Sequence, residues 1–129
     1  MRYILPFLLF VTTTCYGQKE LGWTRSRVIQ TYSEDYSLTA GIDDDGEDFL
    51  YCDLANDAMY IMLFTNNLCT EVLIKYATKH DLYQKVQDYD DDFEVLSYGK
   101  WYVNFNDDYY VFIDLIPEKN CVTFILNTK

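Results

Sequence analysis

His80 is the only histidine of the chain, so any serine or cysteine hydrolase site built on an imidazole base would have to use it. Residues 78–81 have the form of a capping box, which places His80 in the exposed first turn of a helix. Neither a Gly-x-Ser-x-Gly elbow nor a glycine-rich phosphate loop occurs. The sequence therefore predicts a protein that is not an enzyme and has no cofactor. A carboxylate pair such as Asp53 and Asp114 is the alternative route to catalysis.

Asp43, Asp45 and Glu47 lie in an acidic, turn-rich segment, and carboxylates are ligands that calcium accepts. If Gly46 takes the glycine position of a calcium-binding loop, however, the first and last ligand positions hold glycine and cysteine. The segment predicts a weak Ca²⁺ site, with solvated turns as the favoured alternative, because Asp is a common turn residue. One histidine and scattered cysteines do not make a zinc site, so no other metal is expected.

Three cysteines remain after the first 17 residues: Cys52, Cys69 and Cys121. An odd number in an exported protein permits one disulfide and one free thiol. Cys69 and Cys121 each start the last strand of a predicted meander, so a bridge between them is one prediction. The preferred interpretation is that all three are small, buried apolar residues.

Aromatic residues crowd the second half of the chain, with Trp101, Tyr102, Tyr109 and Tyr110 as the candidate binding residues. Tyr and Trp are favoured at recognition surfaces because they bury a large area and keep a polar tip. The alternative is a sheet that is rich in tyrosine for structural reasons alone, since aromatic residues suit strands.

Residues 1–17 have the order of a secretory signal peptide: one positive charge, an apolar run from Ile4 to Val11, and a small polar stretch. The run is too short to cross a bilayer, which needs about 20 apolar residues. We expect an exported chain, periplasmic or secreted, that begins at Gln18 and has no membrane span. Lipid anchoring at Cys15 is the less favoured alternative, because the leucine usual three residues earlier is missing.

Removal of the leader leaves 112 of the 129 residues, the size of one domain at 18–129. Aromatic residues make up 18% of the chain, which excludes a disordered protein. The chain has 21 acidic and 10 basic residues, so the net charge of −11 becomes −12 once Arg2 is lost. Such a charge repels nucleic acid and attracts basic proteins, although it also serves solubility alone.

A helix is predicted from about residue 25 to 34, because Thr24 is a favourable N-cap and an apolar residue recurs every four positions from Val28. A second helix follows Thr78 and ends in the acidic run at 88–92. A short strand at Ser37–Ala40 is compatible with the sequence but is not counted among the main strands. The main strands are predicted at Phe49–Leu54, Ala58–Thr65, Cys69–Tyr76, Val95–Phe105, Tyr109–Ile116 and Cys121–Leu126.

Short connections between these strands predict antiparallel meanders, and helices on one face of such a sheet give an α+β fold. The expected order is α-βββ-α-βββ, with one antiparallel sheet of about six strands, or two fused sheets, and two helices on one face. Alternation in the strand at 69–76 places Glu71 and Lys75 on one face and Val72 and Ile74 on the other.

The halves at 22–76 and 78–127 look alike, which suggests a tandem pseudo-repeat. A shift of 52 residues superposes 49–75 on 101–127 without a gap, although only three positions are identical. Chance similarity between two meanders is the alternative. The superposed pairs include Phe49 with Trp101, Ile61 with Ile113, Leu63 with Leu115 and Cys69 with Cys121.

Gly22, Thr24 and Val28 fit the pattern Gly, any residue, Thr or Ser, three residues, then Val. This opening resembles that of small exported modules of the β-lactamase-inhibitor-protein fold, and of outer-membrane assembly lipoproteins that share it. The match covers about eight residues, and residues 33–35 (SED) replace the Leu-Gly-x-Pro that often closes that helix. The resemblance implies helices before an antiparallel meander, at times twice in tandem, and non-enzymatic binding through the sheet face. The three matching residues would be structural.

The expected function is that of a non-enzymatic, exported binding protein of the bacterial envelope. Its most concrete form is an acidic inhibitor or immunity-type protein, since acidic surfaces accelerate the capture of basic partners. The alternative is a domain that binds a sugar or lipid in a pocket lined by aromatic side chains.

Overall fold

The computed structural model describes residues 19–54 and 58–129. The predicted leader and Cys15 lie outside these residues. The helices are α2 (Arg25–Tyr32) and α3 (Lys79–Asp92), and a 3-10 turn, η2, covers Pro117–Lys119. The strands are β1 (Thr39–Ile42), β2 (Asp48–Asp53), β3 (Met59–Thr65), β4 (Leu68–Lys75), β5 (Glu94–Ser97), β6 (Lys100–Asn104), β7 (Tyr109–Ile116) and β8 (Cys121–Thr128).

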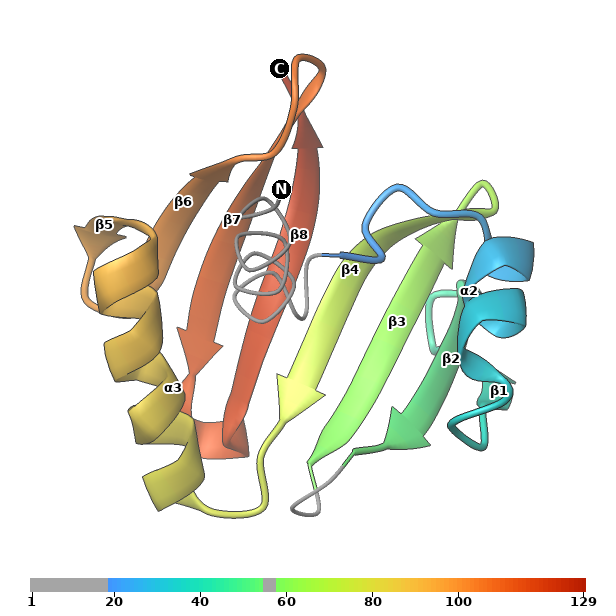
Figure 1. Ribbon diagram of the computed structural model, residues 1–129, viewed down its shortest axis with the longest axis horizontal. Coiled ribbons are helices and arrows are strands. Elements are labelled where there is room, and N and C mark those ends of the chain that lie inside the picture. Colours follow the sequence, from blue (N-terminus) through green and yellow to red (C-terminus); the bar gives the residue numbers. More distant parts are fainter. Residues whose placement is uncertain (1–18, 55–57) are drawn as a thin grey trace, which may run out of the picture.

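All of these strands form one antiparallel sheet in the order β1-β2-β3-β4-β8-β7-β6-β5 (Figure 1). Each helix is followed by a four-stranded meander, and the last strands of the two meanders, β4 and β8, pair in the middle. The α+β class with two helices and one antiparallel sheet is confirmed. The sheet has eight strands, however, and the order is α-ββββ-α-ββββ rather than α-βββ-α-βββ.

Two local features account for the additional strands. Strand β1 forms close to the optional strand at 37–40, and it pairs with β2 at the edge of the sheet. The single strand predicted at Val95–Phe105 is divided into β5 and β6 by a turn at Gly99, whose φ of 78° favours glycine. The Gly99 carbonyl accepts a hydrogen bond from the Leu115 amide at 2.8 Å, which holds this turn against β7.

Both helices begin where the sequence predicts. Thr24 Oγ1 accepts a hydrogen bond from the Arg27 amide at 3.2 Å, and Thr78 Oγ1 accepts one from the Asp81 amide at 3.1 Å. In Figure 1, α2 lies beside β1 to β3 and α3 lies beside β6 and β7. Each meander therefore carries its own helix.

The core lies between these helices and one face of the sheet, which we call the covered face. A continuous row of six side chains crosses this face from β2 to β6, and each is at most 2% exposed. Val28 of α2 and Leu82, Val86 and Tyr89 of α3 belong to the same buried cluster. The members of the row, in register order, are Leu50, Met62, Val72, Phe124, Ile113 and Trp101.

The gapless superposition of the two halves is wrong in register, although the halves share an architecture. Leu63 faces away from the helices, whereas Leu115 lies on the covered face beside Val122. The β3–β4 turn has two residues, Asn66 and Asn67, both with positive φ, while residues 117–120 connect β7 and β8. The pairing of β3 with β4 also contains a register shift between Leu63 and Phe64, which the pairing of β7 with β8 lacks. A slip of one residue exchanges the two faces of a strand, so this shift, rather than the turn length, puts the two meanders out of register.

Candidate functional site

The face of the sheet opposite the helices, which we call the open face, is the candidate site. No helix of the described residues packs on it. Successive residues of a strand point to opposite faces, so every second residue of a strand contributes to the open face. These residues come from β2, β3, β4, β6, β7 and β8. Cys121 and Thr123 of β8 are buried on this face. Its partly exposed apolar members are Phe49, Tyr51, Met59, Ile61, Leu63, Leu73, Tyr102, Tyr110, Phe112, Ile116 and Ile125.

Three aromatic rings form a cluster at the β6–β7 side of the open face. The ring centroids of Tyr102 and Tyr110 are 5.7 Å apart, and those of Tyr110 and Phe112 are 5.1 Å apart in an edge-to-face arrangement. A second pair, Phe49 and Tyr51, lies on β2 with centroids 6.1 Å apart. Two aromatic areas thus stand on either side of the central strands, β4 and β8.

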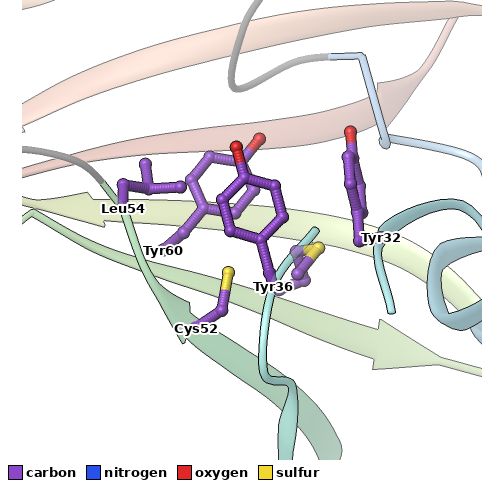
Figure 2. Close-up of a pocket in the computed structure, with 6 residues that line it drawn as sticks. Tyr32, Tyr36, Cys52, Leu54 and Tyr60 are labelled. Atoms are coloured by element: carbon purple, nitrogen blue, oxygen red, sulfur yellow. The ribbon is translucent and has the colours of Figure 1, made fainter. Parts of the chain in front are cut away.

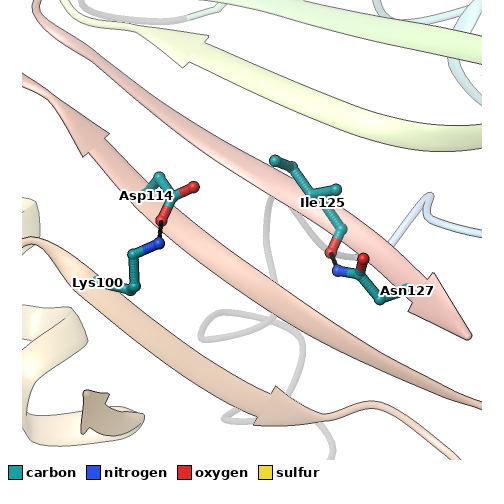
Figure 3. A network of polar contacts seen from close by, with 4 residues as sticks. All are labelled: Lys100, Asp114, Ile125 and Asn127. Carbon is teal, nitrogen blue, oxygen red and sulfur yellow. Dashed lines mark hydrogen bonds and ion pairs between the residues drawn. The ribbon is translucent and has the colours of Figure 1, made fainter. Parts of the chain in front are cut away.

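An ion pair lies next to the aromatic cluster. Lys100 Nζ is 3.3 Å from Asp114 Oδ1, and the two residues are register partners on β6 and β7 (Figure 3). The contact lacks the alignment of a hydrogen bond, so Asp114 Oδ1 has no hydrogen-bond partner within the described residues. Because both side chains are partly exposed, the pair contributes little to stability.

Glu71 stands near the middle of the open face, on β4. Its register neighbours are Leu63 on β3 and Ile125 on β8, both apolar. Partial burial raises the pKa of the Glu71 carboxyl, and the negative charges of Glu47 and Asp43 raise it further. Sequence analysis placed this side chain correctly on the face opposite Val72 but did not identify it as a site residue, because the burial of its neighbours depends on the long-range β4–β8 pairing.

The four aromatic residues predicted to bind do not lie together. Tyr102 and Tyr110 are on the open face, as expected. The prediction for Trp101 is wrong: its side chain is 0% exposed on the covered face, where its indole Nε1 donates to Asp90 Oδ1. Tyr109 has the face parity of the buried Val111, so it also points away from the open face.

The acidic segment at Asp43–Glu47 is a hydrogen-bonded turn between β1 and β2. Asp43 Oδ1 accepts from the amides of Asp45 at 3.0 Å and Glu47 at 2.8 Å. Gly46 has a φ of 85°, which closes the turn. Among the described residues, no three Asp, Glu, Cys or His side chains are close enough together to hold a metal ion. The geometry therefore corresponds to the turn interpretation of Asp43, Asp45 and Glu47 rather than to a Ca²⁺ site.

Cys52, Cys69 and Cys121 are buried and free, so the preferred interpretation of these residues holds. The bridge predicted between Cys69 and Cys121 is absent for a topological reason. Strand β8 runs antiparallel to β4 and pairs Cys121 with Lys75, at the opposite end of β4 from Cys69. Six residues of strand separate the two positions, roughly 20 Å, whereas bridged Cα atoms lie within about 7 Å.

The residues considered for catalysis are scattered. His80 is exposed in the first turn of α3 and contacts Gln84 at 3.2 Å. Asp53 lies on β2 and Asp114 on β7, four strand spacings apart, or roughly 19 Å. These two carboxyls cannot share a proton or a substrate atom at that separation.

A small cavity lies between α2 and the covered face (Figure 2). Its volume is about 10 Å³, which suits one water molecule rather than a sugar or lipid. Beside it, the fully buried Glu20 accepts hydrogen bonds from Tyr60, at 2.5 Å, and from Tyr32. Sequence analysis missed Glu20 because nothing local marks it as buried. The cavity is lined by Tyr32, Tyr36, Cys52, Leu54, Tyr60 and Met62.

Comparisons with known proteins do not extend this description. No protein-family model, no curated protein and no solved structure matches the chain. Neither α2 nor α3, the helices of the described residues, has the length and apolar character that crossing a membrane requires.

Proposed function

We propose that this protein is an exported, non-enzymatic binding protein whose open face contacts a basic protein partner. The observation that carries the proposal is the composition of that face: aromatic and aliphatic side chains from six strands remain partly exposed, with no described helix over them. Monomeric soluble proteins rarely expose large contiguous apolar areas, and such areas mark interaction surfaces. Tyrosines such as Tyr102 and Tyr110 are also the residues that protein interfaces favour.

Charge supports a basic partner. The chain carries 21 acidic and 10 basic residues. At the border of the open face, Glu47 accepts a hydrogen bond from Thr65 at 2.8 Å, and Asp43 lies in the adjacent turn. An acidic border around an apolar centre would speed association with a basic protein at low salt. An inhibitor or immunity-type protein is the most concrete form of this function, and the resemblance of the Gly22–Val28 segment to exported inhibitor modules is in keeping with it.

Binding of a sugar or lipid has weaker support. The cavity beside α2 is about 10 Å³, and pockets for such ligands are about 300–1,000 Å³. The aromatic side chains that could stack on a sugar lie on the other face of the sheet, around Tyr102. We therefore do not propose a small-ligand function.

The test is capture of a partner from an envelope extract by three forms of the tagged protein: wild type, a Tyr102→Ser/Tyr110→Ser variant, and Tyr83→Ser. Tyr83 is 38% exposed on α3, away from the open face, so its variant is the matched control. We expect a basic protein that binds wild type and Tyr83→Ser, is lost from the double variant, and leaves at high salt. Equal capture by all three forms would refute the role of the open face.

A further inference from the structure

Glu71 is a charged residue among apolar side chains of the open face, and this position indicates a role in binding. A row of six register partners crosses the open face from β2 to β6, parallel to the buried row on the covered face. Five members are aromatic or aliphatic, and only one is charged. In register order they are Phe49, Leu63, Glu71, Ile125, Phe112 and Tyr102.

Among residues 19–54 and 58–129, no cationic side chain forms an ion pair with Glu71 that would explain its place in this row. Within the described residues, the ion pairs are Lys85–Asp88 and Lys100–Asp114, and neither includes it. The charges that act on it, those of Glu47 and Asp43, have the same sign and raise the pKa of its carboxyl. A partly buried carboxylate without a counter-ion destabilises a fold. An aliphatic residue at position 71, between Leu63 and Ile125, would not have this cost. The part of the fold that the structure describes therefore gives no reason for this charge.

We infer that Glu71 accepts an arginine side chain that the partner protein inserts at the centre of the open face. This inference rests on the proposed function and names the chemistry by which the same surface selects its partner. An arginine suits the position better than a lysine, because guanidinium is less strongly hydrated and packs on apolar and aromatic surfaces such as Phe112. Its planar donors match a carboxylate in a bidentate contact, and the low dielectric of a closed interface strengthens that contact.

The probe is the pentapeptide acetyl-Gly-Gly-Arg-Gly-Gly-amide, titrated at low salt into the isotope-labelled protein expressed from its full-length reading frame. The matched neutral probe replaces arginine with citrulline, which keeps the shape and removes the charge. Three forms are compared: wild type, Glu71→Gln and Asp91→Asn. Asp91 is exposed near the end of α3, so its variant removes the same net charge far from the open face.

We expect saturable amide shifts at Leu63, Glu71 and Ile125 with the arginine peptide only. Glu71→Gln should weaken binding about tenfold or more, and Asp91→Asn should leave it unchanged within about twofold. Equal binding of the citrulline peptide, equal binding by Glu71→Gln, or no shift in the wild type would each overturn the inference. Partner capture that depends on Tyr102 and Tyr110 but is unchanged in Glu71→Gln would leave the proposed function standing and reject the arginine contact alone.

Discussion

The indole Nε1 of Trp101 donates a hydrogen bond of 2.9 Å to Asp90 Oδ1, which connects β6 to the end of α3. The same indole packs edge-to-face on Tyr89, with ring centroids 5.4 Å apart. The next residue, Tyr102, points to the opposite face and packs on Tyr110. Two neighbouring aromatic residues thus have separate tasks, one in the core and one on the surface.

Replacement of these neighbours should have unequal effects on stability. Trp101→Ala should lower the free energy of unfolding by about 3–5 kcal/mol, because it leaves a cavity in a fully buried site. Tyr102→Ser should lower it by about 1 kcal/mol or less, since the ring is partly exposed. Urea denaturation followed by fluorescence and circular dichroism measures both values. Equal losses would contradict the assignment of the two faces.

Glu71→Gln should stabilise the protein at neutral pH. The pKa of Glu71 is raised in the folded state, so the folded protein holds its proton more tightly than the unfolded chain does. The cost of ionisation is therefore absent in acid and appears as pH rises through the ordinary glutamate range to the raised pKa. After allowance for solvent screening, we expect a gain of about 0.5–1 kcal/mol near neutral pH and none near about pH 3. Paired urea titrations at the two pH values test this sign, with Asp91→Asn as control.

The cysteines should be unreactive until the protein unfolds. Burial raises the pKa of the Cys69 thiol to about 12, and burial also raises the pKa values of Cys52 and Cys121. We expect no rapid labelling by a thiol reagent near pH 8 in the native state, and full labelling in urea. The mass of the denatured adduct also counts the thiols, with three in a chain that lacks Cys15 and four in one that keeps it. A native disulfide would reduce that count by two.

Gly99→Ala should destabilise the β5–β6 turn. The residue has a φ of 78°, and an added Cβ would stand 3.1 Å from the Leu115 Cβ. The left-handed conformation alone costs an alanine about 1–2 kcal/mol. Gly46→Ala, with a φ of 85° but open space around its Cβ, is the matched control and should lose only the conformational part. Differential scanning calorimetry of the two variants separates the conformational and steric terms.

The buried carboxylate of Glu20 should depend on its tyrosine partners. Tyr60→Phe removes the donor to Glu20 Oε1 and should cost about 1–3 kcal/mol, because a buried charged acceptor loses a partner. Tyr36→Phe changes a neighbouring hydroxyl that donates to no acceptor in the described part of the chain, so it should change stability much less. Thermal denaturation of the two variants compares these effects. A larger loss for Tyr36→Phe would contradict the role of Tyr60.

Much of the secondary structure was predictable because its signals are local. Thr24 and Thr78 marked both helix starts, and alternation in β4 placed Glu71 and Val72 on the correct faces. The face of Trp101 was not predictable, because a strand in which both parities are apolar gives no local signal. The packing of α3, in particular the contacts with Tyr89 and Asp90, determines the face of the sheet on which the Trp101 side chain lies.

The relation between the halves was predictable in outline only. Sequence similarity indicated two matched units, and the structure has a helix and four antiparallel strands in each. The alignment failed because of one backbone irregularity, the register shift between Leu63 and Phe64 where β3 pairs with β4. This shift does not change the hydrophobic pattern enough to be recognised, yet it moves a strand by one residue.

The central pairing of β4 with β8 has a kinetic consequence. Each meander joins strands that are neighbours in the chain, so both can form early through short loop closures. The pairing of Glu71 with Ile125 instead joins residues 54 positions apart, and it needs both meanders in place. Because non-local pairing slows folding, the closure of β8 against β4 should be the rate-limiting step. Until that step occurs, two half-sheets expose the hydrogen-bonding edges that the finished sheet conceals at its centre.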